Sequence, residues 1–269
     1  MKAASFWLIC ALVPLSLGGL TSCSDPSEAP RVLLPVVVDA SGVAPVTSDL
    51  GYEVNVTEVR IAIRDVVFTV AGEVHLASVW QAISNTLIPS AFAHPGHAQN
   101  GDVTGEMRGE YVVNWPTDDG RELGTATLIA GTYSASNFTF GRGSAEHLDA
   151  EDPLVGHTAI ISGTATKNGL TMPFTIVVDS PEGRELIGAP FEATIDENAT
   201  GTLNLQFNTL DATEGDTVFD GVDFATLTAD GVGVVVIEPN RVEVEDAYNT
   251  FRRVFQTHDH FNLEHRESP

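Results

Sequence analysis

The chain has 269 residues and is strongly acidic, with 37 Asp and Glu against 13 Lys and Arg and a formal net charge of −24. This charge repels the phosphates of nucleic acids and of anionic lipid headgroups, so nucleic-acid binding is not expected. Hydrophobic residues make up 43% of the chain and there are only two cysteines. The fold must therefore rest on a hydrophobic core rather than on disulfides.

The first 22 residues have the pattern of a secretory signal peptide. Lys2 supplies a positive charge, an apolar run extends from Phe6 to Leu17, and Pro14 interrupts this run. The run is shorter than the ~20 apolar residues that a membrane-spanning helix requires. We therefore expect residues 1–22 to be removed together with Cys10, which leaves 247 residues with a formal charge of −25.

The four residues Leu20-Thr21-Ser22-Cys23 resemble the lipobox of bacterial lipoproteins. The resemblance implies cleavage before Cys23 and acylation of its thiol and amine by palmitate or similar chains. Buried acyl methylenes contribute about 0.8 kcal/mol each to membrane attachment. Ser24 stands where an aspartate would favour the inner membrane, so the resemblance implies an outer-membrane anchor in the cell envelope. The alternative is an ordinary signal peptide with an incidental cysteine.

Residues 23–30 are predicted to form a lipidated tether, since the stretch from Ser24 to Pro30 is polar and rich in proline. The remainder, residues 31–269, is predicted to be a single β domain. Short runs rich in Val, Ile, Thr and Phe alternate there with Gly, Asn and Asp, which is typical of an antiparallel β protein. We expect an all-β fold, an antiparallel β-sandwich of the immunoglobulin-like or a related type, with one C-terminal amphipathic helix.

The predicted strands begin at residues 32–38. Between Val54 and Val70 the apolar positions change parity twice, which predicts bulges or a break because a strand in one register keeps one parity. Farther on, residues 160–166 and 170–178 flank Asn168 and Gly169. The preference of this pair for positive φ angles predicts a type I′ hairpin.

In the C-terminal half, the stretch from Gly201 to Asn208 alternates cleanly between apolar and polar residues. Its apolar residues are predicted to face a core, and Thr202, Asn204 and Gln206 to face water. The run from Gly231 to Glu238 is apolar on both faces and is predicted to be a central strand.

Residues 241–257 are predicted to form the helix. The apolar residues from Val244 to Phe255 recur with helical spacing and make one stripe that should pack on the sheet. Asn240 is the candidate N-cap. A histidine-rich tail follows.

Histidines gather in two short segments. His94 and His97 flank a Pro-Gly turn that lets both side chains converge on one ion. In an extended tail, His258 and His260 would fall on the same side of the chain. Neutral imidazole nitrogen suits Zn and Cu. The sequence therefore predicts a Zn or Cu site formed by His94, His97, His258 and His260.

Four further residues are candidates as alternative ligands or as acceptors that orient the imidazoles. They are His75, Asp102, Glu106 and Asp259. Simpler interpretations remain open for the main set, in which the loop histidines bind nothing and the tail is a disordered polar terminus.

The segment 211–223 holds five acidic residues, Glu214 among them, interleaved with two glycines. Oxygen ligands at this density suit Ca²⁺, and the candidate ligands are Asp211, Asp216, Asp220 and Asp223. The alternating order of an EF-hand loop is absent, so a solvated acidic loop is the favoured interpretation. Phe219 and Phe224 are predicted to fix this segment to the core.

The sequence contains no nucleophile elbow, zinc-protease helix, phosphate loop or dinucleotide fingerprint, so the chain is not predicted to be an enzyme. The expected function is that of a membrane-anchored extracytoplasmic lipoprotein that captures or delivers the metal, with an outer-membrane transporter as partner. The alternative is a structural or adhesive envelope lipoprotein with a protein or glycan partner and no metal. A zinc-dependent hydrolase with Glu106 as base is a third option.

Three short motifs support a resemblance to known proteins. They are His94-Pro95-Gly96-His97, Gly131-Thr132-Tyr133-Ser134 and His258-Asp259-His260. Together they resemble motifs of histidine-rich, β-rich bacterial lipoproteins linked to metal handling and, more loosely, of the secreted copper-binding proteins of methanobactin systems. The latter place aromatic residues near the ion, for which this chain offers only Trp80, Trp115 and Phe92.

Overall fold

The computed structural model describes residues 30–70 and 103–267. The strands in these ranges are β1 (Arg31–Asp39), β2 (Val46–Thr47), β3 (Glu53–Val70), β4 (Val103–Asn114), β5 (Glu122–Ile129), β6 (Gly131–Phe140), β7 (Ala159–Lys167), β8 (Leu170–Val178), β9 (Glu185–Ile195), β10 (Thr202–Phe207), β11 (Val235–Ile237) and β12 (Phe261–Arg266). The α-helices are α2 (Trp115–Asp118) and α3 (Glu245–Phe255), and the short 3-10 helices are η1 (Ala40–Gly42), η2 (Phe224–Thr226), η3 (Val242–Val244) and η4 (His258–His260). None of these helices is long and apolar enough to cross a membrane.

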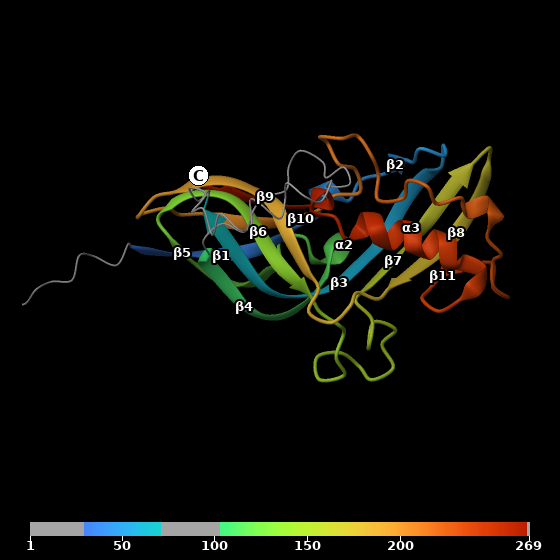
Figure 1. Ribbon diagram of the computed structural model, residues 1–269, viewed down its shortest axis with the longest axis horizontal. Coiled ribbons are helices and arrows are strands. Elements are labelled where there is room, and N and C mark those ends of the chain that lie inside the picture. Colours follow the sequence, from blue (N-terminus) through green and yellow to red (C-terminus); the bar gives the residue numbers. More distant parts are fainter. Residues whose placement is uncertain (1–29, 71–102, 268–269) are drawn as a thin grey trace, which may run out of the picture.

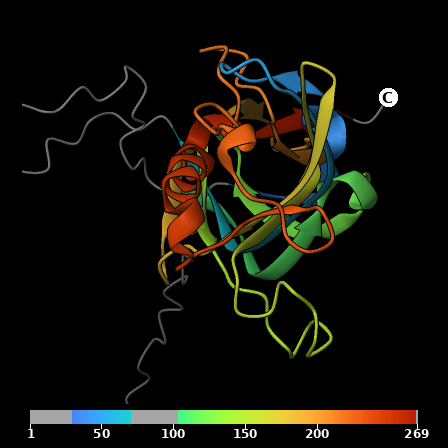
Figure 2. The same cartoon turned by 90° about the vertical axis from the view of Figure 1, so that its right-hand side faces the viewer.

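All of these strands join one sheet that curls around the core (Figures 1 and 2). Its main path is β11-β8-β7-β3-β4-β5-β1-β10-β12, with β2 and β6 also paired to β3, and β9 paired to β6. The curl brings β12, at one end of this path, against β9. The prediction of a β-rich chain with a C-terminal helix is confirmed.

The prediction of a purely antiparallel fold is wrong, because β1 pairs with β10 and β11 pairs with β8 in parallel. A sandwich of two separate sheets is not confirmed either, since the strands form one continuous sheet. Alternation of apolar and polar residues indicates which side chains face the core, but it does not specify the direction of the neighbouring strand.

The long strand β3 lies between the β7–β8 hairpin with β11 on one side of the main path and the strands from β4 to β12 on the other. It pairs with β7 and then β6 along one edge, and with β4 along the other. Its register shifts between Val56 and Glu58 and again between Arg64 and Val66, where Asp65 has a φ of 52°. These are the two places where the apolar parity changes, so the predicted bulges are confirmed.

The predicted hairpin is also confirmed, since Lys167 pairs with Leu170 across Asn168 and Gly169, whose φ angles are 54° and 78°. The prediction of a central strand over residues 231–238 is wrong. Only Val235–Ile237 forms a strand, β11, and it lies at an end of the sheet rather than in its centre. Its apolar residues are covered because α3 packs on it.

The C-terminal helix is shorter than the predicted range 241–257, because η3 precedes α3 and α3 ends at Phe255. Its buried side chains include Tyr248 and Phe251, as the apolar stripe predicts. Asn240 is not the N-cap and instead adopts a φ of 63° in the preceding turn. The tail beyond the helix is ordered, since it forms η4 and then β12.

Aromatic side chains form the centre of the core. Neighbouring rings with centroids 5.0–6.0 Å apart form a chain from the sheet through the acidic segment to α3 and β12. Its members are Tyr52, Phe224, Phe174, Phe219, Phe251, Phe255 and Phe261. Phe219 and Phe224 are fully buried, so the prediction that they fix the acidic segment to the core is confirmed.

Candidate metal sites

The acidic segment after β10 begins with a tight turn, residues 211–216. Leu210 and Thr217 form an antiparallel bridge at its base. The backbone N–H of Asp211 donates to the carbonyl oxygen of Asp216 at 2.9 Å, and the N–H of Gly215 donates to the carbonyl oxygen of Asp211 at 2.9 Å. Gly215 has a φ of 80°, which a glycine adopts at little cost. The backbone of this turn is therefore closed on itself by two hydrogen bonds.

Three carboxylates meet on this turn. One oxygen from each of Asp211, Glu214 and Asp216 lies within 4.8 Å of the other two. Asp211 is only 6% exposed, Asp216 is half-buried and Glu214 is exposed. The Oδ1 atom of Asp216 is buried and has no hydrogen-bond partner among the described residues. Two oxygens that each lie about 2.4 Å from one Ca²⁺ ion are at most ~4.8 Å apart, so this spacing fits a hard cation.

The carboxylate of Asp211 is held in place by the turn itself. Its Oδ1 accepts the N–H of Thr213 at 2.7 Å, and its Oδ2 accepts the N–H of Glu214 at 3.2 Å. Because Asp211 caps the short turn in this way, the residue three positions later is brought over it. The Asp-x-x-Glu spacing of a capping box was the sequence signal that could have placed Glu214 in the cluster.

Asp220 and Asp223, named with Asp211 and Asp216 as Ca²⁺ ligands, do not join this cluster. Asp220 accepts hydrogen bonds from the backbone N–H and hydroxyl of Thr217 at 3.0 and 2.6 Å, and from the N–H of Asp49 at 2.9 Å. Asp223 accepts a short hydrogen bond from the hydroxyl of Tyr52. Burial raises the pKa of Tyr52, and this bond to Asp223 raises it further. Both aspartates therefore fasten the segment to the rest of the fold.

The tail histidines lie in η4, not in the extended conformation that was predicted. Successive residues of a 3-10 helix are about 120° apart, so residues i and i+2 do not share a side. His260 is fully buried, whereas His258 is partly exposed. The alternative of a disordered terminus is wrong as well, since the N–H of Asn208 donates to the carbonyl oxygen of His260 at 2.8 Å and β12 follows.

Each tail imidazole has its Nδ1 beside an oxygen. Nδ1 of His260 lies 3.0 Å from the carbonyl oxygen of Asn208, and Nδ1 of His258 lies 2.5 Å from Oδ1 of Asp259. The Nε2 atom of His260 is buried and has no hydrogen-bond partner among the described residues. Metal-binding histidines have this arrangement, in which one nitrogen is oriented by an oxygen and the other is left for the ion.

The other predicted ligands are not brought together in the part of the chain that the structure describes. His75, His94, His97 and Asp102 lie outside it, as do Trp80 and Phe92. Glu106 lies in β4 and pairs with Arg108 at 2.7 Å. Within residues 30–70 and 103–267, the acidic turn is the one group of three or more potential ligands. Trp115 is buried in the core, where its Nε1–H donates to the carbonyl oxygen of Leu205 at 3.2 Å.

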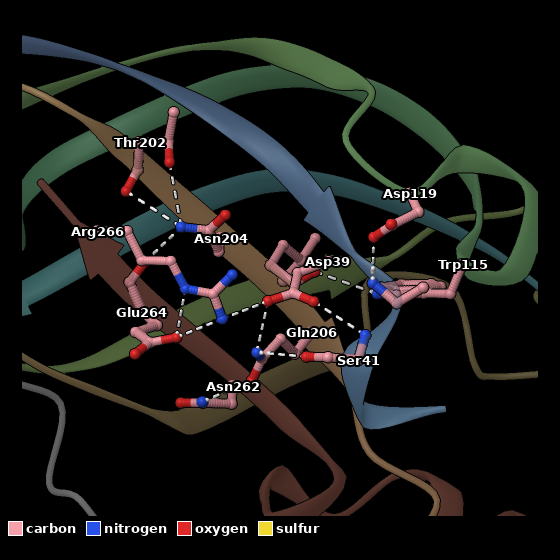
Figure 3. Close-up of polar contacts among 12 residues, drawn as sticks. Asp39, Ser41, Trp115, Asp119, Thr202, Asn204, Gln206, Asn262, Glu264 and Arg266 are labelled. Carbon is pink, nitrogen blue, oxygen red and sulfur yellow. Dashed lines mark hydrogen bonds and ion pairs between the residues drawn. The ribbon is translucent and has the colours of Figure 1, made fainter. Parts of the chain in front are cut away.

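A second polar feature is the network around Asp39, on the outer face of β1, β10 and β12 (Figure 3). Oδ2 of Asp39 accepts from Nε2 of Gln206 at 2.7 Å and lies 2.6 Å from Nη2 of Arg266, while Oδ1 accepts the N–H of Ser41 at 2.9 Å. Nδ2 of Asn262 donates to Oε1 of Gln206 at 3.0 Å. The network buries Gln206 and Asn204, which are only 9% and 5% exposed although they were predicted to face water.

A cleft of about 480 Å³ lies beside the loop that follows β6. Its lining includes Arg60, Arg121 and Arg142, but all three guanidinium groups are engaged within the protein. Arg60 pairs with Asp152 at 2.7 Å, Arg121 pairs with Asp118 at 2.9 Å, and Arg142 donates to two backbone carbonyls. The cleft is therefore a weaker candidate for a binding site than the acidic turn.

No protein-family model, curated protein or solved structure matches this chain.

Proposed function

We propose that this chain is a lipid-anchored protein of the bacterial cell envelope that binds one divalent cation, preferentially Ca²⁺, at the turn formed by residues 211–216. The observation that carries the proposal is the group of three carboxylates, from Asp211, Glu214 and Asp216, with oxygens within 4.8 Å of one another. The buried Oδ1 of Asp216, which has no hydrogen-bond partner among the described residues, adds to it.

Electrostatics favour a cation at this position. Like charges held this close repel one another, and a hydrogen-bonded backbone prevents the carboxylates from separating freely. A bound cation removes this repulsion. Because Ca²⁺ takes six to eight oxygen ligands and Glu214 is exposed, water would complete the coordination, and we expect a dissociation constant of about 0.1–1 mM, as in extracellular modules.

The proposed location rests on the lipobox-like Leu20-Thr21-Ser22-Cys23. Acylation of Cys23 would keep the folded part at the membrane, outside the cytoplasm, where Ca²⁺ at about millimolar concentration is a normal ligand. The cation would then stabilise the segment that follows β10, which reaches the core through Phe219 and through Phe224 at the start of η2.

Calcium titration tests this proposal. The protein from residue 24 onward, without a tag and stripped of metal with a chelator, is titrated with Ca²⁺ by isothermal calorimetry. We expect one ion per chain, and we expect Asp216→Asn to abolish the binding. Asp196→Asn removes the same charge from an exposed residue of another loop and should bind like the unaltered protein. Equal binding by Asp216→Asn, or no binding at all, would contradict the proposal.

A transition-metal site is the second candidate, and the arrangement of His260 favours it. Its Nδ1 is fixed by Asn208 and its buried Nε2 is left without a hydrogen-bond partner among the described residues. In this proposal His260 and the predicted loop ligands His94 and His97 bind Zn²⁺ or Cu²⁺ for capture or delivery to an outer-membrane transporter. Competitive titration with Zn²⁺ tests it, since joint replacement of His94 and His97 by alanine should abolish tight binding while Asp216→Asn should not.

A further inference from the structure

The chain enters the folded part at one end of the sheet. The carbonyl oxygen of Pro30 accepts the N–H of Ala130 at 3.0 Å, and Arg31 pairs with Ile129. We call this end, made by residues 30–33 and the turn 129–132, the anchor end. Figure 1 shows it at one extremity of the long axis of the molecule, with the β7–β8 hairpin at the other extremity.

The tether in front of the anchor end is short. Only residues 24–30 separate Cys23 from Arg31, and seven residues span at most ~25 Å even when fully extended. By comparison, the eighteen residues of β3 run for roughly 55 Å along the sheet. Once Cys23 is acylated, the anchor end must therefore stay close to the bilayer, whereas the β7–β8 hairpin need not.

The outward face of the sheet near the anchor end exposes a large apolar side chain, flanked by Arg31 on the same strand and by Glu106, which lies beyond Thr127 across the sheet. Leu33 is 65% exposed, and Pro35 and Val37 continue the outward face of β1 with half-buried side chains. Thr127, the cross-strand neighbour of Leu33, is uncharged. Because a strongly acidic protein is repelled by anionic headgroups, the lipid surface that suits the exposed Leu33 and its one positive and one negative neighbour is a zwitterionic one.

The candidate cation sites lie at the opposite end of β1. This strand runs nine residues from Arg31 to Asp39, which is roughly 26 Å. It leads into η1, where the carbonyl oxygen of Gly42 accepts the N–H of Thr209, two residues before Asp211. On the same side, Phe207 of β10 pairs with Phe261, the residue after His260.

We infer that the protein rests on its own membrane through the anchor end, with Leu33 against the headgroup region, and that the acidic turn and η4 face away from the lipid. This inference rests on the lipid anchor of the proposed function, but not on cation binding. In this orientation the proposed cation site is open to the surrounding solution and clear of the bilayer surface, so ions in solution can reach it.

Fluorescence quenching in vesicles tests the orientation. The mature chain has no cysteine besides the acylated Cys23, so an introduced cysteine can be labelled alone with the environment-sensitive dye NBD. The lipidated protein is reconstituted in phosphatidylcholine vesicles that carry a headgroup-attached quencher. Leu33→Cys reports on the anchor end, and Leu170→Cys, 60% exposed at the β7–β8 hairpin, is the matched control. Thr132→Cys, at an exposed position of the anchor end, serves as a second reporter in case the β1 substitution prevents folding.

We expect the labels at positions 33 and 132 to be quenched several-fold more strongly than the label at position 170. Equal quenching at both ends, or stronger quenching at position 170, in protein that floats with the vesicles would overturn the orientation alone. Protein that does not float with the vesicles would overturn the lipid anchor, and the orientation with it.

Discussion

Arg266 of β12 places its Nη2 atom 2.6 Å from Oδ2 of Asp39 in β1, and this pair spans β10, the strand that lies between them. The contact connects the first strand of the described chain to its last one. Asp39 is buried, whereas the side chain of Arg266 is 48% exposed. Asp39 therefore depends on this ion pair more than Arg266 does, because water can solvate the exposed guanidinium group. Removing Arg266 would leave the buried carboxylate of Asp39 with fewer donors. This should cost more stability than removing Asp39, which would leave only an exposed guanidinium group without its partner.

We expect the free energy of unfolding to fall at acidic pH because of Asp39. Burial alone would raise the pKa of Asp39, but hydrogen bonds from Ser41 and Gln206 and the charge of Arg266 outweigh it and hold the pKa below its usual 3.8. A folded-state pKa below the unfolded one means that the stabilisation is complete above about pH 4 and is lost as the pH falls through the folded-state value. Urea unfolding at pH 5.5 and at pH 3 measures this loss.

The variant Asp39→Asn isolates this effect, because the amide keeps the shape of the side chain and does not titrate. Its stability should change less between pH 5.5 and pH 3 than that of the unaltered protein. Asp196→Asn, at an exposed position, should retain the original dependence. An Asp39→Asn variant with the full pH dependence would show that other carboxylates cause the acid sensitivity.

Two glycines with positive φ should differ in their tolerance of alanine. Gly169 in the β7–β8 hairpin has a φ of 78° and open space around an added Cβ, so Gly169→Ala should cost about 1 kcal/mol for the left-handed backbone alone. Gly201 has a φ of 111°, and an added Cβ would lie 2.0 Å from the carbonyl oxygen of Arg266. Gly201→Ala should therefore cost about 2–4 kcal/mol. Urea unfolding of both variants gives the comparison, and equal costs would contradict it.

Features that depend on neighbouring residues could be predicted from the sequence. The Asn168-Gly169 turn needs two positive φ angles, and both were found. The parity changes in β3 are local too, because each bulge moves the apolar set to the other face within a few residues. The apolar stripe of α3 follows from helical spacing in the same way.

Features that depend on distant residues could not be predicted. Gln206 belongs to an alternating strand and was expected to face water, but Asp39 and Asn262, far from it in the sequence, cover its side chain. The parallel pairing of β1 with β10 is another case, since nothing in either strand specifies the direction of its neighbour. Sequence patterns report the environment of a side chain on average, and not the partner that creates that environment.

The acidic segment could be predicted in part: its cation-binding character was indicated by the sequence, but its ligands were not. Its density of carboxylates indicated a cation site, but density alone does not tell which carboxylates are already used as hydrogen-bond acceptors. Asp220 and Asp223 are occupied by Thr217, Asp49 and Tyr52. The spacing that places carboxylates together is that of the short turn capped by Asp211.

The two tail histidines should contribute unequally to stability. His260→Ala removes a fully buried ring and its contact with Asn208, so we expect a loss of about 2–4 kcal/mol. His258 is partly exposed, and His258→Ala should cost less than about 1 kcal/mol. Urea unfolding in the presence of a chelator measures both values without a metal contribution. Similar costs for the two variants would contradict the burial of His260 and the partial exposure of His258 in η4.

Calcium should raise the melting temperature through the acidic turn. With a dissociation constant near 1 mM, 10 mM Ca²⁺ would stabilise the folded chain by about 1.4 kcal/mol, which corresponds to roughly 3–5 °C for a chain of this length. Mg²⁺ at the same concentration should have a smaller effect, because it demands octahedral geometry and releases its water reluctantly. Differential scanning calorimetry with each ion, and with a chelator, measures these shifts.

In the same experiment, Asp216→Asn should lose the Ca²⁺-dependent shift, and Asp196→Asn should keep it. With the chelator, Asp216→Asn should melt no lower than the unaltered protein, because removing one of three crowded negative charges relieves repulsion in the cation-free turn. A lower melting temperature in chelator would show that Asp216 stabilises the turn through its own contacts. A shift of equal size in Asp216→Asn and in the unaltered protein would place the calcium elsewhere on this acidic chain, and the assignment of the turn as the cation site would then be wrong.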